Sequence, residues 1–130
     1  MKTEPVVLDS SAWIEYVQNG PNADEYARVF KGKNVEIIVP SVCIFEVYRS
    51  IERIVSMREA MAVTMGMQAY VIDELSSDRA RQAAAISRAH SLSTADAIIY
   101  ATAQSYGATL YTQDADFIKL PGVKYFKHRR

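Results

Sequence analysis

Cysteine and histidine are scarce in this sequence, and their scarcity limits the disulfides and metal sites that the protein can form. The 130 residues include one cysteine, Cys43, and two histidines. A single cysteine excludes an internal disulfide and a cysteine-rich zinc site, and two histidines disfavour a histidine-based metal site. If the protein binds a metal, oxygen atoms must hold it, and a hard cation such as Mg²⁺ or Mn²⁺ suits that ligand type.

The sequence also lacks an excess of charge of either sign. Lys+Arg and Asp+Glu both number 15, so the formal net charge is zero. Bulk attraction to nucleic acid is therefore not indicated, and any such binding must rest on local basic patches. The basic C-terminal segment is one such patch, although terminal charges are more often simply solvated; it carries Lys124, Lys127, His128, Arg129 and Arg130.

Long apolar runs are absent as well. No stretch approaches the ~18 apolar residues of a membrane span, and the N-terminus has no signal-peptide core. We therefore expect a protein without a membrane segment, located in the cytoplasm. With 49% hydrophobic and 23% charged residues, the composition is that of a globular protein, and the length predicts a single domain over residues 1–130.

Short β-branched runs alternate with amphipathic segments along the chain. Strands are predicted at residues 6–8, 35–39, 70–72, 109–112 and 123–126. Helices are predicted at residues 12–18, 22–30, 41–55, 78–90 and 93–106, with another on the methionine-rich stretch of Met57, Met61, Met65 and Met67 and a tight turn or short helix at 116–118. This alternation predicts an α/β fold with a mostly parallel sheet covered on both faces. We expect the methionines to lie in the core.

Four acidic residues stand where an apolar run ends or a helix begins: Asp9, Glu46, Asp96 and Asp114. Asp9 and Asp114 come just past two predicted buried strands, at the edge where open α/β sheets bind their ligands. Carboxylates gathered there would repel one another unless a cation held them. The pattern predicts a divalent-metal site.

Each of these acids also has a purely structural explanation. Asp9 can cap the helix that follows it, and Asp96 belongs to an S-x-x-D capping box. Glu46 lies three residues before Arg49, the spacing of a surface ion pair, and Asp114 can form a turn. A metal site explains all four positions at once, whereas the structural account needs four unrelated coincidences.

Four segments of the chain resemble the motifs of PIN domains: VLDSSAWI at 7–14, FEV at 45–47, STADAIIYATA at 93–103 and LYTQDADF at 110–117. More narrowly, the chain is similar to VapC-type toxins of prokaryotic toxin–antitoxin pairs, from end to end. The resemblance implies a three-layer α/β/α sandwich with about five parallel strands. It also implies an Mg²⁺- or Mn²⁺-dependent endoribonuclease, with one or two ions.

The resemblance assigns the four acids to the catalytic metal site. Asp9 and Asp96 are then the foremost direct ligands, and Glu46 and Asp114 support them. Asp116 is either a fifth, water-mediated ligand or, as we favour, a residue that caps the turn at Phe117.

Three further residues accompany the acids in this interpretation. Ser10 and Thr112 resemble the hydroxyl residues that occur beside the acids in PIN domains. Arg49 could reach RNA phosphates near the metal, pair with surface acids, or bind the tail of an antitoxin.

The resemblance implies an RNA substrate, a VapB-like antitoxin and a homodimer, and some of the methionines could form a dimer surface or an antitoxin groove. One alternative is a PIN-type nuclease of RNA maturation or decay outside toxin–antitoxin systems. A second is a receiver-like signalling module, which would need an adjacent acidic pair after the first strand; Asp9-Ser10-Ser11 does not provide one. A third is a noncatalytic binding domain, which the retention of all four acids disfavours.

Overall fold

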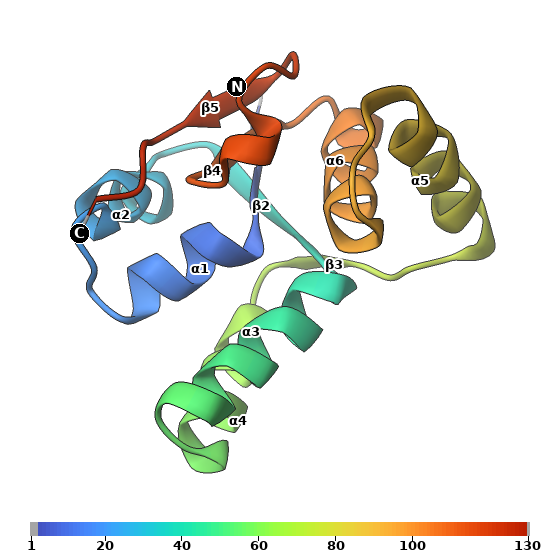
Figure 1. Cartoon of the computed structure of the whole chain (residues 1–130). Helices are drawn as coiled ribbons and strands as arrows, with labels where there is room; N and C mark the ends of the chain where they lie inside the picture. Colours follow the sequence, from blue (N-terminus) through green and yellow to red (C-terminus); the bar gives the residue numbers. More distant parts are fainter. Residues whose placement is uncertain (1–2, 130) are drawn as a thin grey trace.

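Among residues 3–129, which the computed structural model describes, five parallel strands form one sheet in the order β3-β2-β1-β4-β5 (Figure 1). The strands are β1 (Glu4–Leu8), β2 (Val35–Pro40), β3 (Val71–Asp73), β4 (Thr109–Thr112) and β5 (Val123–Tyr125). Apolar residues in the interior of the central strands are fully buried, as in Leu8, Ile38 and Leu110. Continuous apolar runs form these strands because helices cover both faces of the sheet.

The helices are α1 (Ser10–Val17), α2 (Ala23–Lys31), α3 (Ser41–Ile54), α4 (Met57–Met67), α5 (Ser77–His90) and α6 (Thr94–Tyr106), with a short 3₁₀ helix η1 (Ala115–Phe117). Helix α6 packs against β1, β2 and β4 with α5 outside it, and α1 with α2 lies on the other side of the sheet (Figure 1). These three layers confirm the predicted α/β/α class. No helix in the described part of the chain is both long and apolar enough to cross a membrane.

The strand order places a topological switch point between β1 and β4. The chain proceeds from β1 to β2 and β3 on one side, and then crosses back to β4 and β5 on the other. Because parallel crossovers are right-handed, the helices of the two halves cover opposite faces and leave a crevice beyond the carboxyl ends of β1 and β4. The fold therefore brings Asp9, which follows β1, close to the segment that follows β4.

Side chains cap most of the helices that surround this crevice. Asp9 accepts a hydrogen bond from the Ala12 amide at the start of α1, and Ser93 accepts one from the Asp96 amide at the start of α6. Helix α3 has no side-chain cap; Ser41 is its first residue, and the Ser41 hydroxyl accepts the Leu75 amide. At α6, the hydrogen bond between Ser93 and the Asp96 amide fixes the place of Asp96 in the first turn of the helix.

The methionines of α4 do not behave as predicted. Met67 is buried, but Met57, Met61 and Met65 are 62%, 50% and 61% exposed. The core prediction is wrong for these three because α3 and α4 form a hairpin that extends away from the sheet (Figure 1) and α4 buries one narrow face. Together with the exposed Ile54 and Val55, these methionines form an apolar surface, here called the hairpin surface.

Candidate metal site

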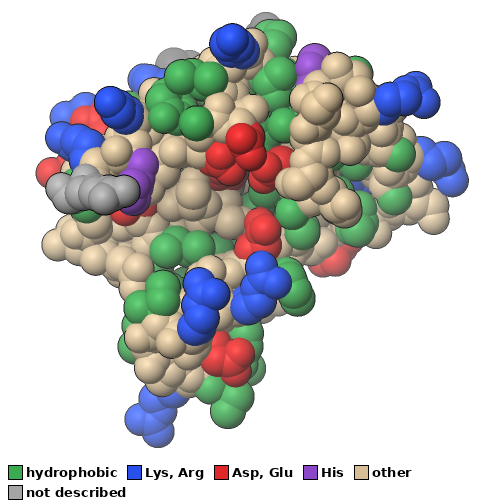
Figure 2. All heavy atoms as spheres, viewed as in Figure 1, with side chains coloured by type: hydrophobic (Ala, Val, Ile, Leu, Met, Phe, Trp, Pro, Cys, Tyr) green, Lys and Arg blue, Asp and Glu red, His purple; other side chains and the backbone are tan. Residues whose placement is uncertain are grey.

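The four predicted acids line one hollow of about 220 Å³ at the carboxyl edge of the sheet. Figure 2 shows acidic side chains gathered at the centre of this face. The lining residues come from α1, α3, α6 and the segment after β4; they are Asp9, Ser10, Ser11, Ile14, Glu46, Arg49, Ser50, Asp96, Ile99 and Asp114. A larger hollow of about 420 Å³ between α5 and α6 has no titratable lining residue. The acidic pocket is therefore the better candidate for chemistry.

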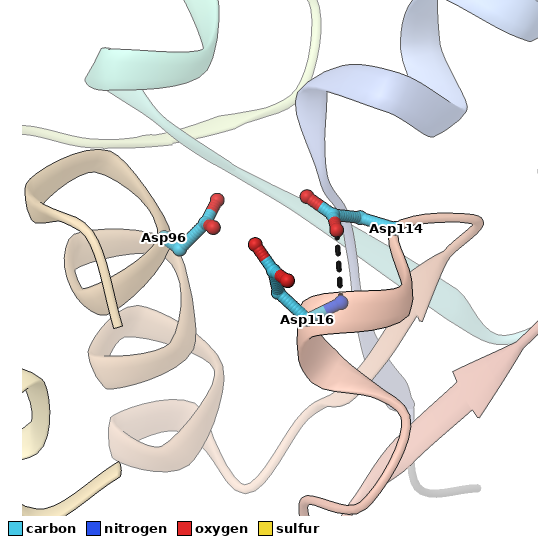
Figure 3. A group of neighbouring side chains, drawn as sticks. All are labelled: Asp96, Asp114 and Asp116. Atoms are coloured by element: carbon cyan, nitrogen blue, oxygen red, sulfur yellow. Dashed lines mark hydrogen bonds between the residues drawn. The ribbon is translucent and has the colours of Figure 1, made fainter. Parts of the chain in front are cut away.

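Three carboxylates come closest together, and Asp116 is one of them. Asp96, Asp114 and Asp116 each offer an oxygen within 4.8 Å of the others, and the side chains point toward one another (Figure 3). The cap of η1 is Asp114, whose Oδ1 accepts the Asp116 amide at 2.9 Å. Asp116 therefore does not cap this helix, and its exposed carboxylate is directed into the acidic cluster.

Asp9 is almost completely buried and fully hydrogen-bonded. The Thr112 hydroxyl donates to Oδ2, while the Ser11 hydroxyl at 2.7 Å and the Ala12 amide at 2.9 Å donate to Oδ1. Burial raises the pKa of Asp9 to about 6, and these three hydrogen bonds oppose that rise. Asp9 lines the pocket but is not part of the group of three.

Glu46 interacts with Ser10 across the pocket. The Ser10 hydroxyl donates to Glu46 Oε1 at 2.6 Å. The ion pair with Arg49, considered above as an alternative, is not formed among the described residues; the Arg49 guanidinium lies over the Phe45 ring, 5.1 Å from its centroid. The carboxylate of Glu46 is therefore held at the pocket by α1 rather than paired on the surface.

Burial and repulsion between neighbouring carboxylates disfavour the ionised form of Asp96. Burial is the largest cause that raises the pKa of Asp96 to about 6; the carboxylates of Asp114, Glu46 and Asp116 contribute to the rise, and the hydrogen bond with Ser93 opposes it. A divalent cation would reverse this repulsion. The donor set, which consists of carboxylates with hydroxyl groups beside them, fits a hard cation such as Mg²⁺ or Mn²⁺.

Two hydroxyl side chains, one predicted and one not, support the site. Thr112, a predicted accessory residue, donates to Asp9 and accepts the Asp114 amide at 2.9 Å, so it joins the ends of β1 and β4. Ser11, which was not predicted, donates to Asp9 and accepts the Gln113 amide. Ser11 and Gln113 lie 102 positions apart, so no local pattern could have identified the contact between Ser11 and the segment after β4.

A second unpredicted network fixes the C-terminal segment beside the site. The buried Asn22 side chain donates to Gln113 Oε1 at 3.0 Å and to the Lys127 carbonyl at 2.9 Å, and it accepts Arg129 Nε at 2.7 Å. His128 contacts Gln113 Nε2 at 2.8 Å. Arg129, which we expected to be solvated, is therefore part of the folded structure.

The sheet order and the acidic pocket define an α/β protein with a candidate metal site at its switch point, and the comparison with known proteins identifies its family. A model of the PIN domain family matches residues 6–123, so the chain belongs to the PIN domain family. A search of curated proteins finds no match.

Solved structures with the same fold include three from toxin–antitoxin systems. A toxin–antitoxin complex from Klebsiella pneumoniae aligns with a TM-score of 0.74 at 23% identity, covering 92% of this chain and 95% of that one. The sarcin–ricin loop cleaving toxin VapC20 from Mycobacterium tuberculosis aligns at 0.74 and 17%, covering 96% and 99%. VapBC2 from Rickettsia felis, bound to a promoter DNA fragment, aligns at 0.76 and 15%, covering 95% and 99%. At these identities, the likeness concerns the fold.

Proposed function

We propose that this protein is the toxin of a type II toxin–antitoxin pair and a Mg²⁺- or Mn²⁺-dependent endoribonuclease that a cognate VapB-like antitoxin neutralises. One observation carries the proposal: Asp96, Asp114 and Asp116 converge at the switch point of a PIN domain, in a pocket that Asp9 and Glu46 also line. The structural neighbours from toxin–antitoxin systems support the toxin assignment.

In this proposal the carboxylates hold the metal, and their neighbours keep them in place. Asp96, Asp114 and Asp116 hold the ion, with Asp9 and Glu46 binding it directly or through water. A bound ion of this kind supplies an activated water and neutralises charge on the scissile phosphate. The hydrogen bonds from Thr112 and Ser10 orient Asp9 and Glu46, and Arg49 lies where it can contact a phosphate.

The test is cleavage of total RNA by the purified protein with and without Mg²⁺ or Mn²⁺. We expect cleavage to require the metal, and Asp9→Asn and Asp96→Asn each to lower the rate by at least ~100-fold, because each removes a charge that holds the cation. Asp78→Asn, which alters an exposed acid on α5, is the matched control and should keep full activity. Circular dichroism should show that all variants are folded.

Full activity in the Asp96→Asn variant, or cleavage in excess EDTA, would contradict the site assignment. Expression alone should stop growth, and co-expression of the antitoxin should restore it. A PIN nuclease outside toxin–antitoxin systems would cleave RNA without this growth arrest. Membership of the PIN family disfavours the receiver-like alternative.

The hairpin surface is our candidate for contacts with the antitoxin or with a second copy of the chain. Its exposed side chains, Ile54, Val55, Met57, Met61 and Met65, adjoin one another along α3 and α4. Contiguous exposed apolar side chains are typical of protein interfaces, and methionine adapts to different partners. This surface therefore supports the proposed antitoxin and homodimer.

A further inference from the structure

We propose that Phe45 and Arg49 form a nucleotide subsite beside the acidic pocket. In this subsite the Phe45 ring stacks on an unpaired base of the RNA, and the Arg49 guanidinium binds an adjacent phosphate. The proposal rests on the proposed ribonuclease function and names the residues that hold the RNA next to the carboxylates.

The position of Phe45 is the first argument. Phe45 is 60% exposed although it is a large apolar residue, and it directly precedes Glu46 on α3. Arg49 follows one helical turn later, lies over the ring at 5.1 Å, and lines the pocket with Asp96 and Asp114. The Phe45 ring therefore lies at the rim of the pocket and contacts the Arg49 guanidinium, which lines the pocket.

The free charge of Arg49 is the second argument. Within residues 3–129, Arg49 forms no ion pair, and the nearby acid Glu46 accepts a hydrogen bond from Ser10 instead. Arg53, one further turn along α3, is likewise exposed and without an ion pair in this part of the chain. Figure 2 shows basic side chains bordering the acidic centre on the α3 side. A guanidinium without a carboxylate partner remains available to a phosphate.

The chemistry of stacking then selects the substrate. Every base presents a flat face to an aromatic ring, so stacking accepts any sequence but requires a base that is not already stacked in a duplex. The hairpin surface differs, because its side chains are aliphatic or methionine and none of them lines the acidic pocket. Ile54 lies nine residues beyond Phe45 on α3, roughly 13 Å along the helix axis.

The experiment measures RNA binding apart from cleavage. A fluorescent single-stranded oligoribonucleotide and the same strand in a full duplex are titrated with the Asp96→Asn protein by anisotropy. Adding Phe45→Ala should weaken single-strand binding by roughly 10-fold, the size of a lost base–aromatic stack, and should leave duplex binding within about 2-fold. Phe45→Trp should restore the affinity. Leu75→Ala, which removes a large exposed apolar side chain outside both the acidic pocket and the hairpin surface, is the control and should have no effect.

The possible outcomes separate this proposal from the proposed function. If the protein cleaves RNA but Phe45→Ala binds the single strand as tightly as its parent, the subsite is wrong and the nuclease assignment stands. If no RNA is cleaved but Phe45→Ala still selectively weakens single-strand binding, the subsite stands and the nuclease assignment fails. If Phe45→Ala changes only the oligomeric state or antitoxin binding, Phe45 belongs to a protein interface and the proposal is overturned.

Discussion

At the scale of single residues, Asp9 has the most unusual environment in the site. Its carboxyl is 3% exposed, and its pKa is about 6 in the folded protein against an ordinary value of 3.8. Between these two values the unfolded chain releases the proton of Asp9 while the folded chain retains it. The folded state binds more protons there, so stability falls as the pH rises from about 4 to about 6. Above about pH 6 the free energy of unfolding stays at this lower value unless a cation binds.

Asp9→Asn should therefore stabilise the metal-free protein at neutral pH. A raised pKa of this size predicts a gain of about 1–3 kcal/mol in the free energy of unfolding at pH 7.5 and almost no gain at about pH 3, where the carboxyl is mostly protonated in both states. Urea unfolding in EDTA at the two pH values measures the difference. The control is Asp24→Asn, an exposed acid on α2, which should shift neither value. Lower stability of Asp9→Asn at pH 7.5 would refute this reading of its environment.

The residues also show which parts of the site the sequence could predict. Asp9 and Asp114 follow buried strands, and Asp96 follows a capping serine, so local patterns located all three. The Ser10–Glu46 hydrogen bond and the entry of Asp116 into the cluster depend on contacts between α1, α3, α6 and η1. Such contacts cannot be predicted from the spacing of residues along the chain. The i, i+3 spacing suggested an ion pair between Glu46 and Arg49 that is not formed.

At the scale of elements, the connection between α1 and α2 is tightly packed around Gly20. A Cβ atom on Gly20 would lie 2.3 Å from Glu15 Oε1, and the same carboxylate accepts the Asn22 amide at 2.7 Å. Asn22 in turn holds Gln113 and the C-terminal segment. One turn between two helices thus supports the segment that carries Asp114.

Gly20→Ala should destabilise the protein by about 1–3 kcal/mol, because the added methyl group displaces a buried carboxylate and its hydrogen bond. Gly66→Ala is the matched control: Gly66 lies in α4 with open space at its Cβ position, and alanine should stabilise the helix by about 0.5–1 kcal/mol. Urea unfolding of both variants measures the sign of the change in the free energy of unfolding for each. Equal effects would show that the contact with Glu15 relaxes at little cost.

The elements themselves were largely predictable, and their placement was less so. Apolar runs such as Val6–Leu8 and turn residues such as Gly107 marked strands and helix ends near the observed bounds. The periodicity of α3 and α4 was also correct, but it could not show that the hairpin would leave the sheet. The spacing of apolar residues shows that a helix has an apolar face, but it does not show which partner covers that face. For this reason Met57, Met61 and Met65 were assigned to the core.

At the scale of the whole molecule, the proposed metal binding would be coupled to folding. A cation held by Asp96, Asp114 and Asp116 would bind only the folded chain, because these side chains come from α6 and from the segment after β4. Binding to the folded state alone stabilises it by an amount that grows with the metal concentration, about 2.7 kcal/mol at a hundred times the Kd. The same cation must compete with protons for Asp9 and Asp96.

Mn²⁺ should accordingly raise the melting temperature at pH 7.5 and have a much smaller effect at pH 5, where Asp9 and Asp96 retain protons. Asp116→Asn should weaken Mn²⁺ binding about 10-fold, because it removes one of three clustered charges, whereas Asp78→Asn should not change it. Thermal unfolding over a Mn²⁺ titration measures both effects. An unchanged Mn²⁺ response in Asp116→Asn would exclude this carboxylate from the metal site.

The central position of β1 has a consequence for the synthesis of the chain. Its Val6 pairs with Thr109 of β4, so one edge of the first strand remains open until about a hundred further residues have been synthesised. At about 5–20 residues per second this interval lasts roughly 5–20 s. Asp96, Asp114 and Asp116 are made in the same later part of synthesis, so a nascent chain first holds Asp9 and Glu46 without the acids that complete the pocket. A protein with the proposed activity would thus be harmless to the messenger that encodes it until these three residues have emerged and β4 has paired with β1.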